Sequence, residues 1–557
     1  MAEIDADAAT WPPAAIRPST EAVEDYRRRG LWRAEHLLDF LDQHRRETPD
    51  DIAVVGYRTD GPTVTLTWYE YAGQVERFAS ALRALGVGPG QVVAIQAPNW
   101  WETSALILAV IRTGAVVAPV IAALRNRELE KVLAQLRATV VVTVSEWDGY
   151  DHAGALAEMA GRLPYLRHRV VMGRAAGDGE LSFEEHFVRA SWAERHPMPL
   201  AEPVDPDQVA LTLFTSGTTG EPKAVLHTSN TMAAMSAGVV EDGNLGRSEA
   251  AYTPHNLTHI LSIAVSIILP LQTGSRAVLF DAWAPGRIAE IIEEARPTIL
   301  CAAAFFVDDI LKATAAAGTD TSSLRYVISG AAPIPPKLVH DVYKTLGVPL
   351  QAAYGMTELP IGTWTRMDDP PDWAAHSDGR PGPALEIDLR GDGEISKENP
   401  AELHVRGAGL CLAYVGRDSG TVEILADRDG GWFNTGDLVV SDGRGGIRHV
   451  GRAADRVGGA LMIPVADVEA QLLEHPAVAD VAIVGYVGAN GQETGCAVVA
   501  GAGTPPTLDE IRAYLTAEGM TEFYQPTRVE TMDRLPRNAN GKVLKRELRT
   551  WVQQRAS

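Results

Sequence analysis

Short apolar runs alternate with helix-like segments along most of the chain, up to about residue 450. VVAIQAP at 92–98 precedes an apolar helical segment at 104–113, and AVVAPV at 115–120 precedes ELEKVLAQLR at 128–137. A short, fully apolar run fits a strand that is buried on both faces, and such a strand needs helices to cover it. The alternation therefore predicts an α/β fold with mainly parallel sheets flanked by helices.

The stretch from Ser104 to Leu124 is the strongest candidate for a membrane span. Arg112 stands near its centre, where a charge costs roughly 2.5 to 3.5 kcal/mol in a bilayer. Gly114 and Pro119 then interrupt any continuous helix. We expect a buried helix that ends near Thr113 and Gly114, followed by a buried strand, and no membrane span.

The texture of the sequence changes twice in its later part. Short strand-like runs separated by Gly- and Asp-rich turns predict a small β subdomain from about 378 to 450. A compact α+β pattern follows, and a chain of 557 residues is too long for one simple core. We therefore place one domain at 1–451 and a second at 452–557. Two Pro- and acid-rich segments, 198–207 and 368–373, are expected to be loose linkers.

Charge and cysteine content exclude several function classes. The 50 Lys and Arg residues face 72 Asp and Glu, a net charge of -22 that repels nucleic acids and anionic bilayers. Cys301, Cys411 and Cys496 lie far apart and form neither a disulfide framework nor a thiolate zinc site. The acidic amino terminus also lacks the basic start of a secretory signal, so we expect a cytoplasmic protein.

The strongest signal for chemistry is the loop in LTLFTSGTTGEPKAV, residues 211–225. Small residues leave backbone N–H groups accessible, hydroxyls add donors, and Lys223 adds a positive charge, which together suit a phosphate chain. Pro222 stands where a P-loop needs glycine, so the loop is not of that type. A plain flexible turn is the alternative. The candidate phosphate-binding residues before the lysine are Thr215, Ser216, Gly217, Thr218, Thr219 and Gly220.

FTSGTTGEPK closely resembles the signature loop of the adenylate-forming superfamily, which includes acyl-CoA synthetases, adenylation domains and luciferases. Further motifs of that family follow in order, and the likeness spans roughly residues 35 to 550. They are SGAAPIP (329–335), YGMTE (354–358), NTGDL (434–438), the hinge-like GRAADRV (451–457) and LPRNANGK (535–542). The resemblance makes 1–451 an adenylation domain that binds ATP and the acid, and 452–557 a mobile lid.

Within YGMTE, the resemblance and the residue chemistry agree. Tyr354 offers a ring for adenine, Thr357 a hydroxyl for the α-phosphate, and Glu358 a hard oxygen ligand for Mg²⁺. Read alone, the segment suggests a helix amino terminus with a capping threonine. The resemblance also places Gly330, Ala331, Ala332 and Gly355 at the nucleotide.

The later motifs add the sugar contacts and a second lysine. Asp437 can accept bonds from both ribose hydroxyls, and Arg452 can donate to the same sugar, although singly they suggest a turn and a surface residue. The resemblance gives Lys542 the decisive catalytic role, bridging the substrate carboxylate and the α-phosphate. Together with Lys223 and Mg²⁺, it would neutralise the anions that must meet.

The resemblance implies activation of a carboxylic acid by ATP, followed by transfer of the acyl group to coenzyme A. Two departures bear on the acceptor. Segment 455–469 is one residue shorter than is usual, without charge at 458–462, and Ala454 replaces a polar hinge residue. Ala224, where glycine is usual, is a minor change. Transfer to an amine or to a carrier-protein thiol is therefore an alternative, and a non-catalytic nucleotide-binding protein is a third hypothesis.

The acid itself is indicated only by class. LTHILSI and IPVADVEAQLLEHPAVADVAIVG most resemble segments of ligases for alicyclic and medium-chain acids, such as cyclohexanecarboxylate-CoA ligase. His259 matches a pocket-side position of the family, while a core histidine with satisfied hydrogen bonds is the alternative. Phe305 and Phe306 are candidates for an apolar acyl pocket or for ordinary core.

Overall fold

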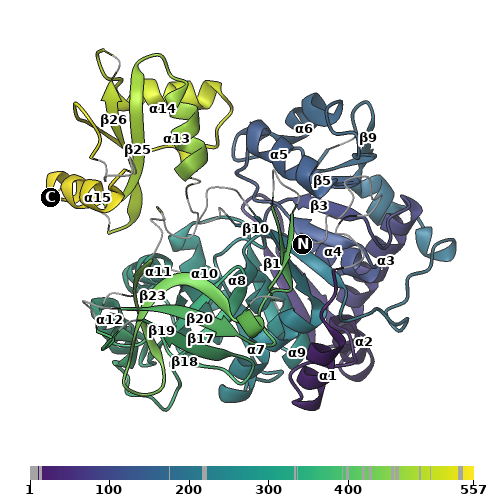
Figure 1. Cartoon of the computed structure of the whole chain (residues 1–557). Helices are drawn as coiled ribbons and strands as arrows, with labels where there is room; N and C mark the ends of the chain where they lie inside the picture. Colours follow the sequence, from purple (N-terminus) through teal and green to yellow (C-terminus); the bar gives the residue numbers. More distant parts are fainter. Residues whose placement is uncertain are drawn as a thin grey trace.

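The computed structural model, shown in Figure 1, contains two large sheets covered by helices and a small body formed by the last part of the chain. The described residues are 11, 16–174, 176–215, 223–330, 334, 336–391, 393–396, 400–416, 421–425, 429–452, 457, 463, 465–488, 491–501, 503–536 and 543–556. This architecture confirms the predicted α/β class.

One nine-stranded sheet has the order β18-β17-β16-β15-β14-β12-β13-β1-β2. Its middle strands run parallel and its outer pairs are antiparallel, as β1 with β2 and β16 with β17. The strands are β1 (Ile52–Tyr57), β2 (Val64–Thr67), β12 (Ala250–Tyr252), β13 (Arg276–Phe280), β14 (Ile299–Ala303), β15 (Tyr326–Gly330), β16 (Leu350–Met356), β17 (Leu359–Trp364) and β18 (Arg380–Pro381).

The other nine-stranded sheet has the order β22-β21-β11-β10-β4-β3-β5-β8-β9. Strands β21 and β22 come from the region predicted to be a separate β subdomain. Instead, β21 pairs with β11, and β22 pairs with β21 at the edge of this large sheet. The assignment of TVEIL, which contains β22, to the subdomain is therefore wrong. The strands are β3 (Val92–Gln96), β4 (Val116–Pro119), β5 (Val140–Val144), β8 (His168–Met172), β9 (Glu180–Ser182), β10 (Val209–Thr215), β11 (Lys223–Thr228), β21 (Ala413–Gly416) and β22 (Val422–Ile424).

Helices cover both sheets. The predicted buried helix is α4, which ends at Arg112, and the predicted strand after it is β4. No helix in the described part of the chain is both long enough and apolar enough to cross a bilayer. The helices are α1 (Thr20–Arg28), α2 (Leu37–Glu47), α3 (Trp68–Ala84), α4 (Trp101–Arg112), α5 (Asn126–Leu136), α6 (His152–Ala160), α7 (Ser229–Asp242), α8 (Ile260–Ile263), α9 (Leu269–Thr273), α10 (Pro285–Ala295), α11 (Ala304–Ala317) and α12 (Pro336–Leu346).

A four-stranded antiparallel sheet is formed by residues that precede the small body in the sequence. Its order is β19-β20-β23-β24, with β19 (Glu386–Arg390), β20 (Ala401–Arg406), β23 (Phe433–Ser441) and β24 (Ile447–Arg452). This sheet is the part of the predicted β subdomain that the structure bears out. Short elements elsewhere are the hairpin β6 (Glu146–Trp147) and β7 (Tyr150–Asp151), and the helical turns at Glu184–Arg189, Trp192–Glu194, Ala264–Ile268, Trp373–Ala375 and Asp429–Gly431.

The small body has an α+β fold, in which helices pack on a three-stranded sheet with the order β25-β26-β27 (Figure 1). Its elements are α13 (Val465–Leu473), β25 (Val478–Val487), β26 (Glu493–Gly501), α14 (Leu508–Ala517), the turn η7 (Glu522–Tyr524), β27 (Arg528–Thr531) and α15 (Lys545–Ala556). The sequence patterns predict the first four and miss β27 and α15. The boundary at 451 stays a prediction.

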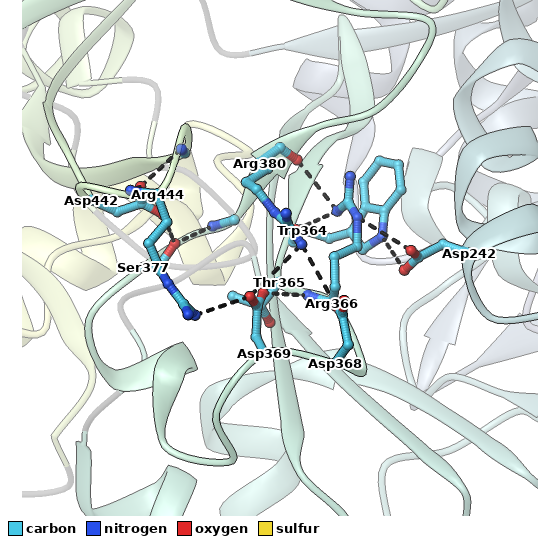
Figure 2. A network of polar contacts seen from close by, with 12 residues as sticks. Asp242, Trp364, Thr365, Arg366, Asp368, Asp369, Ser377, Arg380, Asp442 and Arg444 are labelled. Carbon is cyan, nitrogen blue, oxygen red and sulfur yellow. Dashed lines mark hydrogen bonds and ion pairs between the residues drawn. The ribbon is translucent and has the colours of Figure 1, made fainter.

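Both segments expected to be loose linkers form ion pairs with other elements, and their looseness stays a prediction. In the first, the buried Arg112 guanidinium lies 2.9 Å from the Glu202 carboxylate. In the second, Figure 2 shows Asp369 among arginines: its carboxylate accepts a 2.8 Å bond from the Arg366 backbone N–H and lies 3.4 Å from Arg444 Nη1. Composition alone does not reveal these contacts with arginines of neighbouring elements.

Candidate functional site

The YGMTE segment forms the end of β16 and a tight turn into β17. Among the described residues at this turn there is no helix, so the alternative of a capped helix amino terminus is wrong. A side chain at Gly355 would place its Cβ 2.0 Å from the Pro360 carbonyl oxygen, so the turn requires glycine here. The turn places Glu358 in the protein interior, where the residue is 4% exposed.

Tyr414 joins the two charged groups that the sequence assigned to phosphate and metal. Its hydroxyl donates a hydrogen bond to Glu358 Oε1, and Lys223 Nζ lies 4.8 Å from the centroid of its ring. Burial, and then the neighbouring carboxylate, raise the pKa of Tyr414, so the phenol stays neutral and acts as a donor. The sequence did not indicate Tyr414, because only the pairing of β21 with β11 in the folded sheet brings it to Lys223.

Backbone contacts hold the turn that carries Glu358. The Cys411 N–H donates to the Glu358 carbonyl over 2.8 Å, and His227 Nε2 lies 2.9 Å from the Thr357 carbonyl oxygen. A carbonyl only accepts, so this nitrogen carries the proton. Burial lowers the pKa of His227 to about 4, which keeps the ring neutral. His227 is thus a second residue at the site that the motifs did not indicate.

The predicted sugar-binding residues also come together. The Tyr354 hydroxyl donates to Asp437 Oδ2 over 2.6 Å, and His449 Nε2 lies 3.4 Å from Asp437 Oδ1. Asp437 in β23 and Arg452 in β24 are direct cross-strand partners. Asp437 is only 1% exposed, so its carboxylate is held by neighbours rather than by solvent. His449 was not predicted, since only the pairing of β23 with β24 brings it here.

The three predicted pocket residues belong to one aromatic cluster. The Phe305 and Phe306 ring centroids are 4.0 Å apart, and the His255 ring lies 5.1 Å from both Phe306 and His259. Burial lowers the pKa of His259 to about 4, and His259 Nδ1 accepts a bond from the Leu261 N–H at the start of α8. His259 is therefore a neutral residue of this cluster that caps α8. His255 is the member that the sequence did not indicate.

Other candidate residues divide between strand ends and undescribed segments. Thr215 ends β10 and Gly330 ends β15, both at the carboxyl end of their strand, where α/β proteins commonly bind ligands. A Cβ at Gly330 would lie 2.3 Å from the Ala353 carbonyl oxygen. Outside the described residues lie Ser216, Gly217, Thr218, Thr219, Gly220, Ala331, Ala332, Ala454, the 458–462 segment and Lys542.

The donor set fits Mg²⁺ better than a metal held by protein alone. Within the described parts of the chain, no group of three or more His, Cys, Asp or Glu side chains is arranged to hold a metal. Glu358 offers a buried carboxylate, and Tyr414 joins it to Lys223. Mg²⁺ is commonly held by one or two carboxylates, with water and substrate phosphates completing its shell. A single buried carboxylate that is joined through Tyr414 to Lys223 matches that pattern.

Comparison with known proteins gives consistent matches along the chain. Residues 41–415 match the family model of AMP-binding enzymes, and residues 467–542 match that of the AMP-binding enzyme C-terminal domain. The medium-chain fatty-acid–CoA ligase of Escherichia coli is 28% identical, covering 95% of this chain and 93% of the relative. The feruloyl-CoA synthase of an Amycolatopsis species is 32% identical, covering 87% of this chain and 93% of the relative.

Among solved structures, the amide bond synthetase McbA from Marinactinospora thermotolerans is similar to this chain throughout. The two share 26% identity with a TM-score of 0.77, covering 93% of this chain and 100% of the other. The similarity thus includes both the large sheets and the small carboxy-terminal body.

Proposed function

The chain belongs to the family of AMP-binding enzymes and is an AMP-forming acid ligase, and we propose that it activates a carboxylic acid with ATP and passes the acyl group to coenzyme A. The observation that carries the proposal is the convergence of four segments distant in sequence. Lys223 and Glu358 meet on Tyr414, and Asp437 meets Tyr354 four residues before Glu358. These groups suit, in turn, phosphate, Mg²⁺ and the nucleoside.

The first half-reaction joins two anions. A carboxylate oxygen attacks the α-phosphorus of ATP, the bond to the bridging oxygen of pyrophosphate breaks, and an acyl-adenylate forms. Lys223 and Lys542 would lower the repulsion between the reacting groups, and the loop at 215–220 would donate to phosphate oxygens. Mg²⁺ held by Glu358 would supply further positive charge to the phosphates. Asp437 and Arg452 would hold the ribose, with Tyr354 beside the base.

The second half-reaction uses the adenylate as an activated acyl group. The sulfur of coenzyme A attacks the acyl carbon, AMP leaves with the bonding electrons, and the thiol proton goes to solvent or a base. CoA ligases with different acids, a medium-chain fatty acid and ferulate, are similar to this chain over most of its length. Their names support a thioester product and an apolar acid. The aromatic cluster of His259, Phe305 and Phe306 supports the same class of acid.

Amide formation is the second candidate function. The observation that favours it is the similarity to an amide bond synthetase over nearly the whole chain. The uncharged segment at 458–462, which the family places at the site in the second half-reaction, also suits an acceptor less charged than coenzyme A. An amine nitrogen would then attack the same acyl carbon and release AMP.

Acid-dependent exchange between labelled pyrophosphate and ATP tests the first half-reaction. A panel of medium-chain, alicyclic and aromatic acids should give exchange with at least one acid, and no exchange with any of them would contradict the proposal. Addition of coenzyme A, an amine or a phosphopantetheinylated carrier protein then identifies the acceptor, since mass spectrometry distinguishes the three products. We further propose a reducing, cytoplasmic setting, which the three buried free cysteines support.

A further inference from the structure

Tyr414 contacts both Lys223 and Glu358, with its ring toward the first and its hydroxyl on the second. It is 5% exposed and Glu358 is 4% exposed, so water contributes little to holding either group. From this arrangement we propose that Tyr414 is a positioning residue: its hydroxyl orients the Glu358 carboxylate for Mg²⁺ of the bound nucleotide, and its ring supports the Lys223 ammonium. The proposal rests on the proposed function and adds a residue to it.

Strand pairing brings Tyr414 to this place. In the antiparallel pair of β11 and β21, Val225 lies opposite Tyr414 and Lys223 lies opposite Gly416. Lys223 and Tyr414 are therefore diagonal neighbours two residues apart, and residues at that offset share one face of a sheet. The same stretch of chain also holds the turn, because the Cys411 N–H donates to the Glu358 carbonyl over 2.8 Å. One segment thus fixes both the backbone and the side chain of Glu358.

The chemistry of the contact indicates orientation rather than proton transfer. Burial and the neighbouring carboxylate both raise the pKa of the phenol, so Tyr414 keeps its proton and donates it in a hydrogen bond to Glu358 Oε1. A carboxylate whose rotation is restricted by one donor presents its remaining acceptor positions in a fixed direction. Hydrogen-bond donors to metal-binding carboxylates usually matter for metal affinity, with losses of about 10- to 100-fold on their removal.

Removal of one hydroxyl separates this role from simple packing. Tyr414→Phe keeps the ring, its contact with Lys223 and its 6.0 Å contact with the Phe433 ring. Titration calorimetry with α,β-methylene-ATP, which cannot undergo cleavage between the α and β phosphates, gives its affinity with Mn²⁺ and without metal. We expect Tyr414→Phe to reduce the gain in affinity that Mn²⁺ provides by about tenfold, while affinity for the metal-free nucleotide stays unchanged.

Kinetics provide an independent readout. In pyrophosphate exchange, Tyr414→Phe should need about tenfold more Mg²⁺ for half-maximal rate, recover most of its rate at saturating Mg²⁺, and keep its KM for the acid. Tyr71→Phe is the matched control, because that buried hydroxyl bonds Ser104 in the α3–α4 core and removing it should change neither measurement.

Two results would overturn the proposal. One is an unchanged Mn²⁺-dependent gain in Tyr414→Phe, and the other is an equal loss of affinity for the metal-free and the metal-bound nucleotide. If wild-type protein neither binds the nucleotide nor exchanges pyrophosphate, the proposed function fails instead, so the two failures are distinguishable.

Discussion

The candidate site and the contact between the large domain and the small body are held by different kinds of interaction. At the site, Tyr354, Tyr414 and Asp437 are each less than a tenth exposed and are joined to their neighbours by direct side-chain hydrogen bonds. Among the described residues of the two bodies, Thr521 accepts a hydrogen bond from Arg125 and donates one to Glu128, and Phe523 and Tyr524 pack against the large domain. These contacts motivate the hypothesis, tested below, that the small body changes its position while the candidate site stays fixed.

The interdomain contact has a form that allows separation. The Thr521 hydroxyl oxygen accepts a 3.2 Å bond from the Arg125 N–H and donates a 2.9 Å bond to Glu128 Oε2. Arg125 is the N-cap of α5 and Glu128 is three residues further on. In a capping box, the side chain at that third position accepts directly from the N-cap N–H. If the small body moved away from α5, Glu128 could therefore accept the hydrogen bond from the Arg125 N–H itself.

The largest expected effect comes from the lysine of the small body. If a mobile body supplies Lys542 only for adenylation, Lys542→Ala should lower acid-dependent pyrophosphate exchange by about a thousandfold, as for loss of a charged group that stabilises a transition state. Reaction of a supplied acyl-adenylate with the acceptor should keep most of its rate. Equal loss of both reactions would contradict the division of roles between the two bodies.

Asp437→Asn tests the rigid side of the comparison. The variant loses the charge that we propose binds the ribose, and a hydrogen bond to a charged group is worth about 1.5 to 3 kcal/mol. We expect kcat/KM for ATP to fall about 10- to 100-fold. Asp388→Asn is the matched control, because Asp388 lies in the same small sheet and pairs with Arg390 at the surface. A similar loss in both variants would indicate disturbance of the sheet.

Only some residues of the candidate site can be predicted from the sequence. Glu358 and Asp437 lie in short continuous motifs, so the roles proposed for them can be predicted from local residue order. Tyr414 and His449 reach the site through the pairing of β21 with β11 and of β24 with β23. Pairing across a sheet depends on packing of distant segments, and no local pattern encodes it.

The contacts of the two expected linkers could not be predicted for a related reason. Composition indicates that the Pro- and acid-rich segments are loose, but their acidic groups meet arginines from other elements, such as Arg112 and Arg444. Alternating strands and helices, in contrast, are determined by local apolar patterns, so the α/β class and helix α4 are predicted correctly. The domain boundary stays a prediction.

Acid should weaken the large domain through its buried histidines. Burial lowers the pKa of His259 to about 4, against about 6.5 in an unfolded chain. The unfolded state therefore binds more protons between these values, and stability is lost as pH falls from about 6.5 to 4. At pH 5 the loss is about 2 kcal/mol for one such group.

His259→Asn measures this contribution, since asparagine is also a favoured N-cap residue and can replace the bond to the Leu261 N–H. Urea unfolding at about pH 7.5 and pH 5 should show a smaller acid-induced loss of stability in the variant than in the wild type. An identical loss in both proteins would show that His259 titrates normally.

Thr521→Val should have the smallest effect on stability and a specific effect on domain contact. Because Glu128 can accept the Arg125 N–H directly, the large domain should lose less than about 1 kcal/mol. Hydrogen exchange of the turn at 520–525 should nevertheless become faster, since the contact that holds this turn against α5 is gone.

Thr507→Val provides the matched comparison within the small body. Thr507 caps α14, where its hydroxyl accepts from the Glu510 N–H, so its loss should speed exchange within Leu508–Ala517 and leave the interdomain turn unchanged. The same change from threonine to valine thus tests a helix cap within the small body and a contact between the two bodies. If Thr521→Val left exchange at 520–525 unchanged, packing of Phe523 and Tyr524 against the large domain, rather than the hydroxyl, would hold the two bodies together.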